Sequence, residues 1–367
     1  MLRYLRSSLS VLRPRALVRT QKSVDTLLTE TQEVRRALKQ LADEQRQMHA
    51  GHHDLRASIE SVAGEMRAMH QQVRTLIHRE SQLRAIARAE TELEDALGRA
   101  PLVCDEARLG RHIDAAVRGA DLHLDPFPYI VVQQLFPEGF YQALVRAIPP
   151  VELFGDKPLN RQHLKVPFDL APAYSRRIWG FFAHRVAPHI LQPALVDRFR
   201  EPLRDWIVAN WPSLAADPFG PPMEMNTGDG RMLLRGRGYR IRPHRDPKWG
   251  FLTCLLYLAR EHDSESWGTQ LFAVEGDRPA AGAAPHWIDA ADCRLAAEVP
   301  FRRNSLLVFL NSTGAHGAHI PDDAEPADLR RYAYQWRIGP NGKAIRALMA
   351  ALPEEQASLW AGKRSGY

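Results

Sequence analysis

The 367-residue chain has only three cysteines, Cys104, Cys254 and Cys293, which lie far apart and form no CxxC pair. This scarcity argues against a disulfide framework and a cysteine-built zinc site, and it fits a reducing compartment. The chain also lacks an apolar run long enough to span a bilayer, and arginines interrupt any signal-peptide core. With 45% hydrophobic residues, the sequence instead suits a globular core.

Acidic residues are absent from residues 1–24, and the six basic residues there equal the formal net charge of +6. The rest of the chain is balanced, so we expect no nucleic-acid partner. Residues 1–22 form a basic leader with leucines at helical spacing, which could make peripheral contact with an anionic membrane. The leader also resembles an organellar transit peptide, and a frayed terminus is the simplest alternative. We expect a cytoplasmic protein, with membrane association or organellar targeting as alternatives.

An apolar residue recurs at every seventh position between residues 24 and 83, without proline. In a heptad written abcdefg these residues occupy position d, and the residues three places before them occupy position a. The a positions are apolar in five of nine heptads. Polar Thr31, Gln45 and His52 at a would fix the register of paired helices at some cost in stability. A lone amphipathic helix would drift from a strict seven-residue period, so the pattern predicts a coiled coil over residues 23–90. We expect a homo-oligomer formed through residues 24–83. The d positions are Leu27, Val34, Leu41, Met48, Leu55, Val62, Met69, Leu76 and Leu83.

Residues 91–120 are alanine-rich and charged, which predicts a helical linker. From residue 121 the composition changes to aromatic and β-branched residues with frequent proline and glycine, and a domain over 121–345 is expected, followed by a C-terminal helix and tail over 346–367. Its first part predicts a strand and helices, and its second part predicts mainly antiparallel strands. The expected strands are 126–136, 231–243, 251–259, 269–274, 305–311 and 331–339, and the expected helices are 137–148, 175–192, 193–208 and 344–360.

The pattern His-x-Asp occurs four times, and a His and an Asp two apart can both ligate one metal ion. His52 occupies a heptad core position, His112 lies in the helical linker and His123 precedes the first strand in a loop. His244 and Asp246 differ from these because they lie between two predicted strands and because His316, His319 and a strand-borne arginine follow. Two imidazoles and one carboxylate form the ligand set of non-haem Fe(II) oxygenases, and an arginine fork suits a carboxylate.

These segments, in this order, resemble the Fe(II)- and 2-oxoglutarate-dependent dioxygenases, in the branch of the prolyl 4-hydroxylases. The resemblance covers about residues 121–340 and rests on "YRIRPHRD", "LTCLLYL", "WGTQLF", "NSLLVFLNSTGAHGA" and "RRYAYQW". It implies an α+β chain whose catalytic domain is a double-stranded β-helix, or jelly roll, with flanking helices, preceded by the long coiled coil.

The resemblance also implies roles for individual residues. His244, Asp246 and His316 would be the Fe(II) ligands and the catalytic centre. Arg331 would bind the distal carboxylate of 2-oxoglutarate with help from Tyr257, and Tyr239 would contact co-substrate or substrate. His319 competes with His316, and Arg330 with Arg331, because the interval between the distal ligand and the arginine is longer than in many relatives. Alternation along the strand favours Arg331, Ala333 and Gln335 on one face.

The implied reaction hydroxylates a protein side chain, a glycan or a small molecule, using O₂ and releasing succinate and CO₂ from 2-oxoglutarate. Ascorbate is a candidate stimulant. One alternative is an oligomeric scaffold whose jelly roll binds metal or ligand without turnover, and another is a cupin-like metalloprotein without 2-oxoglutarate.

Overall fold

The computed structural model describes the backbone of residues 4–155, 162–220, 223–277 and 282–364, and side chains from residue 22 onward except those of 24, 54 and 229. The chain forms two compact units, residues 1–77 and 78–367. The predicted roles of the basic leader depend on side chains that lie outside this description, and they stay predictions. None of the helices in the described part is long and apolar enough to cross a membrane.

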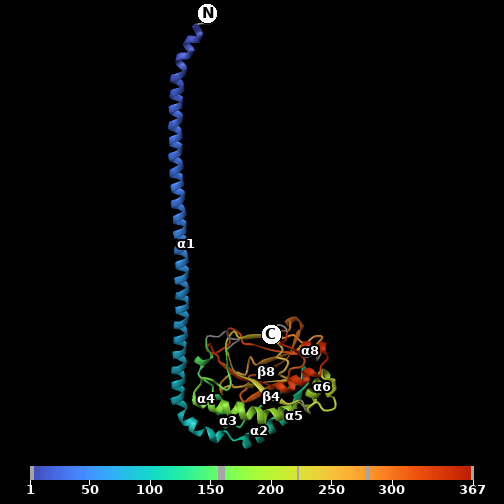
Figure 1. The fold of residues 1–367 in the computed structure, drawn as a ribbon. Helices are drawn as coiled ribbons and strands as arrows, with labels where there is room; N and C mark the ends of the chain where they lie inside the picture. The colour runs from blue at the N-terminus through green and yellow to red at the C-terminus, as the bar shows by residue number, and fades with distance from the viewer. Residues whose placement is uncertain (1–3, 156–161, 221–222, 278–281, 365–367) are drawn as a thin grey trace. The chain divides into compact units, whose positions relative to one another are not determined.

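The heptad segment forms one uninterrupted helix, α1 (Tyr4–Val103), of 100 residues (Figure 1). At 1.5 Å per residue it is roughly 150 Å long. It continues beyond the predicted segment 23–90 and includes part of the expected linker 91–120. The rest of that linker is α2 (Glu106–Gly119), which begins after the N-cap Asp105, whose side chain accepts a hydrogen bond from the Arg108 amide.

The second unit is α+β and contains two antiparallel sheets among its described residues. The seven-stranded sheet has the order β1-β2-β9-β6-β11-β4-β3, and the four-stranded sheet has the order β5-β10-β7-β8. The strands are β1 (Leu122–His123), β2 (Tyr129–Val132), β3 (His163–Lys165), β4 (Met225–Arg235), β5 (Arg240–His244), β6 (Leu252–Tyr257), β7 (Thr269–Val274), β8 (Cys293–Val299), β9 (Ser305–Leu310), β10 (Ala315–His319) and β11 (Arg331–Pro340).

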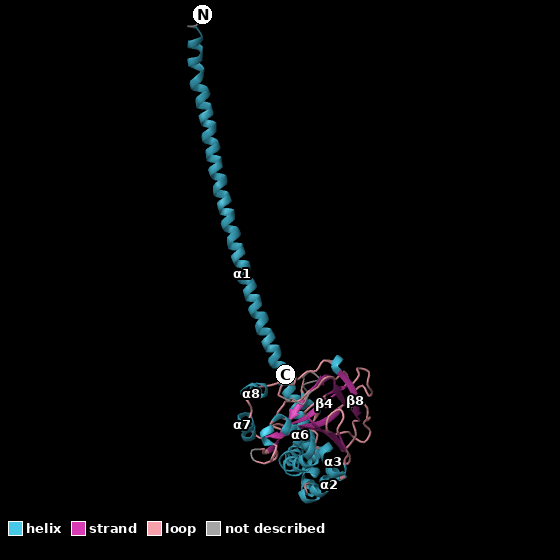
Figure 2. Ribbon diagram, turned by 90° about the vertical axis from the view of Figure 1, so that its right-hand side faces the viewer, coloured by secondary structure: helices cyan, strands magenta, loops and turns pink. Residues whose placement is uncertain are grey.

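Helices cover one face of the seven-stranded sheet, and α2, α3, α4 and α5 line one side of the strands in Figure 1. Figure 2 places α7 and α8 together at one side of the strands. The helices are α3 (Glu138–Arg146), α4 (Ala173–Phe181), the π-helix η3 (Phe182–Leu191), α5 (Gln192–Arg198), α6 (Arg200–Asn210), α7 (Gly342–Ala350) and α8 (Glu354–Trp360), with short 3₁₀ turns η1 (Val151–Phe154), η4 (Pro212–Leu214) and η5 (Ala290–Asp292).

Alternation along the strands separates the core from a cavity between the sheets. On β11, Tyr332, Tyr334 and Trp336 pack against the helices, while Arg331 and Gln335 line the cavity. Strands β6 and β9 are buried throughout and mostly apolar, because one of their faces packs against the helices and the other faces the four-stranded sheet. The predicted jelly roll with a preceding long helix is thus confirmed.

Several predicted element boundaries were wrong. The single strand expected over 231–243 is two strands in different sheets, because the chain turns at Gly238, whose φ of 72° favours glycine. His123 lies in β1 and not in a loop. The helix expected over 344–360 is interrupted before Pro353, which lacks the amide needed to continue it. Strands β3, β8 and β10 were missed; β10 contains two histidines and a glycine, and β8 is mostly exposed on one face.

Candidate metal and 2-oxoglutarate site

Two histidines are placed side by side by strand pairing. His244 ends β5, and its Cα is directly paired with that of His316 on the neighbouring strand β10. The centroids of the two imidazole rings are 4.1 Å apart, and both side chains are buried. Cross-strand neighbours on one face of a sheet stay close, so this pairing alone brings the two imidazoles together.

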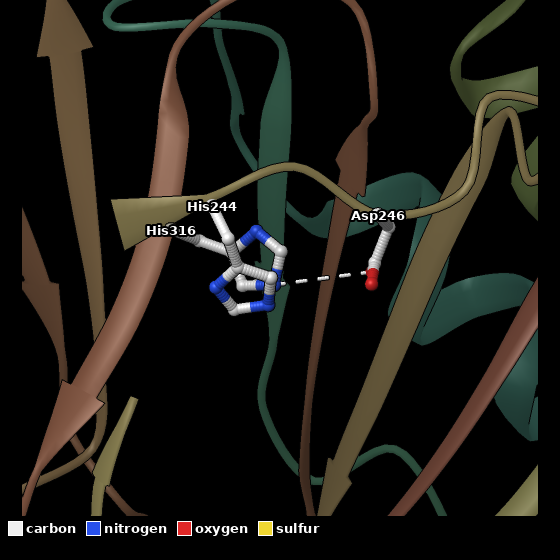
Figure 3. Close-up of side chains that lie close together, drawn as sticks. All are labelled: His244, Asp246 and His316. Atoms are coloured by element: carbon white, nitrogen blue, oxygen red, sulfur yellow. Dashed lines mark ion pairs between the residues drawn. The ribbon is translucent and has the colours of Figure 1, made fainter. Parts of the chain in front are cut away.

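Asp246 completes a group of three potential metal ligands. Its carboxylate comes from the segment after β5, and one ligand atom from each of His244, Asp246 and His316 lies within 4.8 Å of the others. Figure 3 shows the two rings next to each other and Asp246 facing them, with the Nε2 of His316 3.9 Å from the Oδ2 of Asp246. Among the residues that the structure describes, this is the one such group of three.

The Asp246 segment is held by hydrogen bonds to its backbone and its carboxylate. The Asn311 side chain and the Arg364 guanidinium donate to the Asp246 carbonyl at 3.0 and 2.7 Å. Arg337 donates to Oδ1 at 2.7 Å, and the Thr253 hydroxyl donates to Oδ2 at 2.6 Å. A carboxylate has about four lone-pair sites, so two hydrogen bonds orient Asp246 and still leave sites for a cation.

The protonation of the three side chains suits metal binding. Burial by itself raises the pKa of the Asp246 carboxyl, but Arg337 and the two imidazoles outweigh it and hold that pKa well below its usual range. Burial, and then the proximity of His244, lowers the pKa of His316 to about 3. The pKa of His244 is lowered as well, chiefly by burial. A carboxylate and two neutral imidazoles at neutral pH are the forms that ligate a metal.

His244 has a defined orientation. Its Nδ1 lies 3.0 Å from the carbonyl oxygen of Arg242, which occupies that nitrogen and leaves Nε2 as the ligand atom. His319, the alternative distal ligand, is exposed at the end of β10 and is outside the cavity lining. The structure therefore brings His316 and not His319 to the other two ligands.

A cavity of about 770 Å³ between the sheets contains this group. Arg331, Tyr257 and Tyr239 also line it, whereas Arg330 is exposed and does not. The Tyr239 ring lies 4.5 Å from the guanidinium of Arg235. The Tyr257 hydroxyl donates to the Thr269 hydroxyl at 2.7 Å, and burial raises the pKa of this phenol, so it stays protonated.

Arg331 is a buried cation with unused donors. Its Nη2 donates to the Ser264 carbonyl at 2.7 Å, but its Nε and Nη1 are buried and make no hydrogen bond. The guanidinium lies 4.3 Å from the Phe301 ring and 5.3 Å from the Trp267 ring. Burial lowers its pKa to about 10, so it remains charged at neutral pH. Buried donors without partners are rare. Arg331 also lines the cavity, where a carboxylate could accept from its guanidinium.

Sequence reasoning missed several residues around the site. Arg337 was detectable, since it continues the alternation of Arg331, Ala333 and Gln335 on β11, but its bond to Asp246 depends on the folded structure. His286 and Trp287 also line the cavity, and Trp287 is bridged to His244. They lie in irregular chain between β7 and β8, where no periodic pattern could have indicated them.

Comparisons with known proteins give structural similarity without sequence relatives. No family model matches the chain, and no curated protein sequence matches it. The chain is similar in structure to HygX from Streptomyces hygroscopicus, solved with nickel and 2-oxoglutarate bound, at a TM-score of 0.35 and 14% identity, covering 58% of this chain and 83% of HygX. It is similar to a prolyl-4-hydroxylase from Pseudomonas putida, at 0.35 and 13%, covering 63% and 100% of the two chains. A prolyl 4-hydroxylase from Phytophthora capsici gives 0.36 and 12%, covering 70% and 77%. Similarity this distant assigns no reaction, so a function must be inferred from the residues of the site.

Proposed function

We propose that this protein is an Fe(II)- and 2-oxoglutarate-dependent dioxygenase that hydroxylates its substrate. The observation that carries the proposal is the buried Arg331 guanidinium, with two unused donors, in the same cavity as His244, Asp246 and His316. Two imidazoles and one carboxylate leave open positions on a metal, as non-haem iron oxygenases require. A ligand group alone would fit many metalloproteins, and the buried, incompletely hydrogen-bonded Arg331 in the same cavity favours a co-substrate with a carboxylate, such as 2-oxoglutarate.

The residues present fit both groups. His244, Asp246 and His316 would hold Fe(II), and the Arg331 guanidinium would hold the distal carboxylate of 2-oxoglutarate. When bound together, iron and 2-oxoglutarate supply the oxidising power for O₂-dependent hydroxylation, with succinate and CO₂ as co-products.

The protein contributes orientation and a dry environment. Arg337 and Thr253 keep Asp246 ionised and fixed in rotation, and the Arg242 carbonyl fixes His244. Phe301 and Trp267 flank Arg331 and exclude water from the guanidinium, which strengthens its attraction for a carboxylate. The Tyr257 hydroxyl donates its hydrogen bond to Thr269, and the protonated side chain lines the cavity near Arg331.

The test is binding of Fe(II) and 2-oxoglutarate under anaerobic conditions, followed by the visible charge-transfer absorption of the joint complex. The full chain should give this absorption, and His316→Gln should not, whereas the exposed His319→Gln should behave as the wild type. Admission of O₂ should then yield succinate. Absence of the joint complex would sink the proposal, and a complex without succinate in the presence of varied substrates would favour the ligand-binding scaffold.

A further inference from the structure

The cavity is lined by more positively charged side chains than the binding of iron and 2-oxoglutarate requires. Among the described residues that line it, Asp246 is the single acid, and the proposed function accounts for Asp246, Arg331 and Arg337. Four further arginines line the same cavity, Arg231, Arg235, Arg240 and Arg242. 2-Oxoglutarate has two carboxylates, one for the metal and one for Arg331, so it supplies no anion to Arg231, Arg240 or Arg242.

The four arginines come from both sheets. Arg231 and Arg235 project into the cavity from β4, where the alternating residues Met232 and Leu234 pack on the opposite face. Arg240 and Arg242 belong to β5, the edge strand of the four-stranded sheet that also carries His244. The charges therefore approach the cavity from two walls.

Arg235 and Arg242 both contact neutral groups. Arg235 donates to the carbonyls of Gln162 and Leu234 at 3.0 and 2.8 Å, and Arg242 lies 4.6 Å from the Trp287 ring. Within the described ranges, neither Arg231 nor Arg240 forms an ion pair or a side-chain hydrogen bond. Arg231 is half-buried, and Arg240 and Arg242 are exposed. Positive charges around one cavity repel one another, most strongly where they are shielded from water, and an anionic ligand relieves that repulsion.

We propose that the prime substrate is a small molecule carrying a phosphate or an equivalent tetrahedral oxyanion such as a sulfate, and that Arg231, Arg240 and Arg242 bind this group beside the metal. This inference rests on the proposed function. A planar carboxylate presents its lone pairs in one plane, whereas a tetrahedral oxyanion accepts from guanidinium groups on several sides, which fits arginines on two walls. The volume of about 770 Å³ is that of a small-molecule site.

The experiment is calorimetric titration of the metal-free full chain with phenyl phosphate, phenyl sulfate, benzoate and benzyl alcohol, in the presence of saturating 2-oxoglutarate. Phenyl phosphate or phenyl sulfate should bind, and Arg231→Gln and Arg242→Gln should each weaken binding by about tenfold or more, since hydrogen bonds to charged groups are among the strong ones. Arg330→Gln, at the exposed residue just before β11, is the matched control and should bind as the wild type. Thermal unfolding checks that each variant folds.

The outcomes are distinct. Equal binding of benzyl alcohol, tightest binding of benzoate, or binding that the two variants do not weaken would overturn the proposal. Weaker 2-oxoglutarate binding in Arg231→Gln or Arg242→Gln would show that these arginines serve the co-substrate instead. Failure of the proposed function has a separate signature, which is loss of the joint Fe(II) and 2-oxoglutarate complex while phenyl phosphate still binds.

A second inference concerns α1 and rests on a different observation. We call the nine d-position residues of the sequence analysis the heptad stripe; they lie exposed along α1, with Leu27 61% and Met48 64% accessible. In a two-stranded coiled coil the positions flanking such a stripe, e and g, decide orientation. Acids occur at g and not at e: Glu30, Glu44 and Glu65.

An arginine or a histidine, each able to donate a hydrogen bond to a carboxylate, follows five positions after each of these acids. Arg35, His49 and His70 occupy the e positions that face Glu30, Glu44 and Glu65 of a second chain in a parallel, in-register pair. An antiparallel pair would place g against g and bring acid against acid, which is destabilising. We infer that the occupant of the heptad stripe is a second copy of this chain, parallel and in register. Arg79, a basic residue at g, is the exception.

Cysteine cross-linking of the full chain tests this arrangement. Cys104 and Cys293 are replaced by serine, and Cys254 is kept because burial raises its pKa well above the usual value and makes it inert. Single variants Val34→Cys and Leu76→Cys should both form dimers on mild oxidation, since only a parallel, in-register pair brings both positions opposite themselves. Arg36→Cys, at an outward f position, is the matched control and should not. A monomeric mass by light scattering, or cross-linking at only one of the two positions, would overturn the inference.

Discussion

The two units of this chain violate the usual distribution of polarity in opposite ways. Residues 22–77 expose what proteins normally bury, with Leu41 62% accessible, whereas the β domain buries what proteins normally expose, with Asp246 and Arg331 each 3% accessible. Each departure costs free energy in the isolated chain. Both departures agree with the binding that we propose, of a second helix to the apolar face of α1 and of a metal with anions to the β domain.

The largest expected effect comes from breaking the buried ligand group. Asp246→Ala should abolish metal binding and succinate release, because it removes one of the three proposed ligands. It should also destabilise the fold by about 3–5 kcal/mol, since Arg337 would remain as a buried charge without its carboxylate. Metal titration, succinate assay and urea unfolding measure the three effects.

His316→Gln separates the two consequences, because it leaves the pair of Asp246 and Arg337 intact. This variant should no longer bind the metal, but its free energy of unfolding should fall much less than that of Asp246→Ala. Metal binding that survives in both variants would show that the three residues are not the ligands.

The next largest effect is expected from a disruption of the exposed heptad stripe of α1. Leu41→Lys combined with Val62→Lys should raise the dissociation constant of the oligomer by at least about 100-fold, because two buried apolar contacts are each worth about 1.5–3 kcal/mol. Sedimentation over a range of concentrations measures it. Succinate release per chain from a small substrate should not change, and Arg36→Ala, on the outer face of α1, should leave the mass as in the wild type.

Arg331→Met sharpens the comparison within the β domain. It should weaken 2-oxoglutarate binding by about 10–100-fold, which corresponds to the loss of charge-assisted hydrogen bonds. The metal-free protein should be no less stable, because a buried cation with unused donors is replaced by an apolar chain of similar length. Calorimetry and thermal unfolding provide the two measurements, with Arg330→Met as the control. A clear loss of stability would mean that Arg331 is a structural residue.

The smallest effect is the pH dependence of the metal-free protein. Burial lowers the pKa of His316 to about 3 in the folded state, so the unfolded chain, with a histidine pKa near 6.5, takes up the proton first. Stability is fully present above pH 6.5 and should fall by about 1 kcal/mol between pH 7 and 5.5 on account of this residue. Urea unfolding at the two pH values measures it, and His316→Gln should flatten the dependence.

Much of the fold followed from sequence patterns with a strong period. The heptads predicted the helix, and β7, β9 and β11 lie within a residue of the expected ranges because uniformly apolar or alternating runs indicate buried strands. Strand β10 was missed since Ala315–His319 has neither pattern. The break between β4 and β5 was missed because the arginines and glycines between them do not interrupt the strand pattern clearly enough to indicate where one strand ends before the turn at Gly238.

The sequence by itself determined the order of the motifs, the candidate ligands and the alternation that turns Arg331 inward and Arg330 outward. Only the tertiary structure decided between His316 and His319, because that choice depends on the pairing of β10 with β5 across about 70 residues of chain. It also revealed the bond of Arg337 to Asp246 and the four arginines that gather from two sheets. Periodicity specifies which face of an element a residue occupies, but contact between elements is set by how their faces pack together.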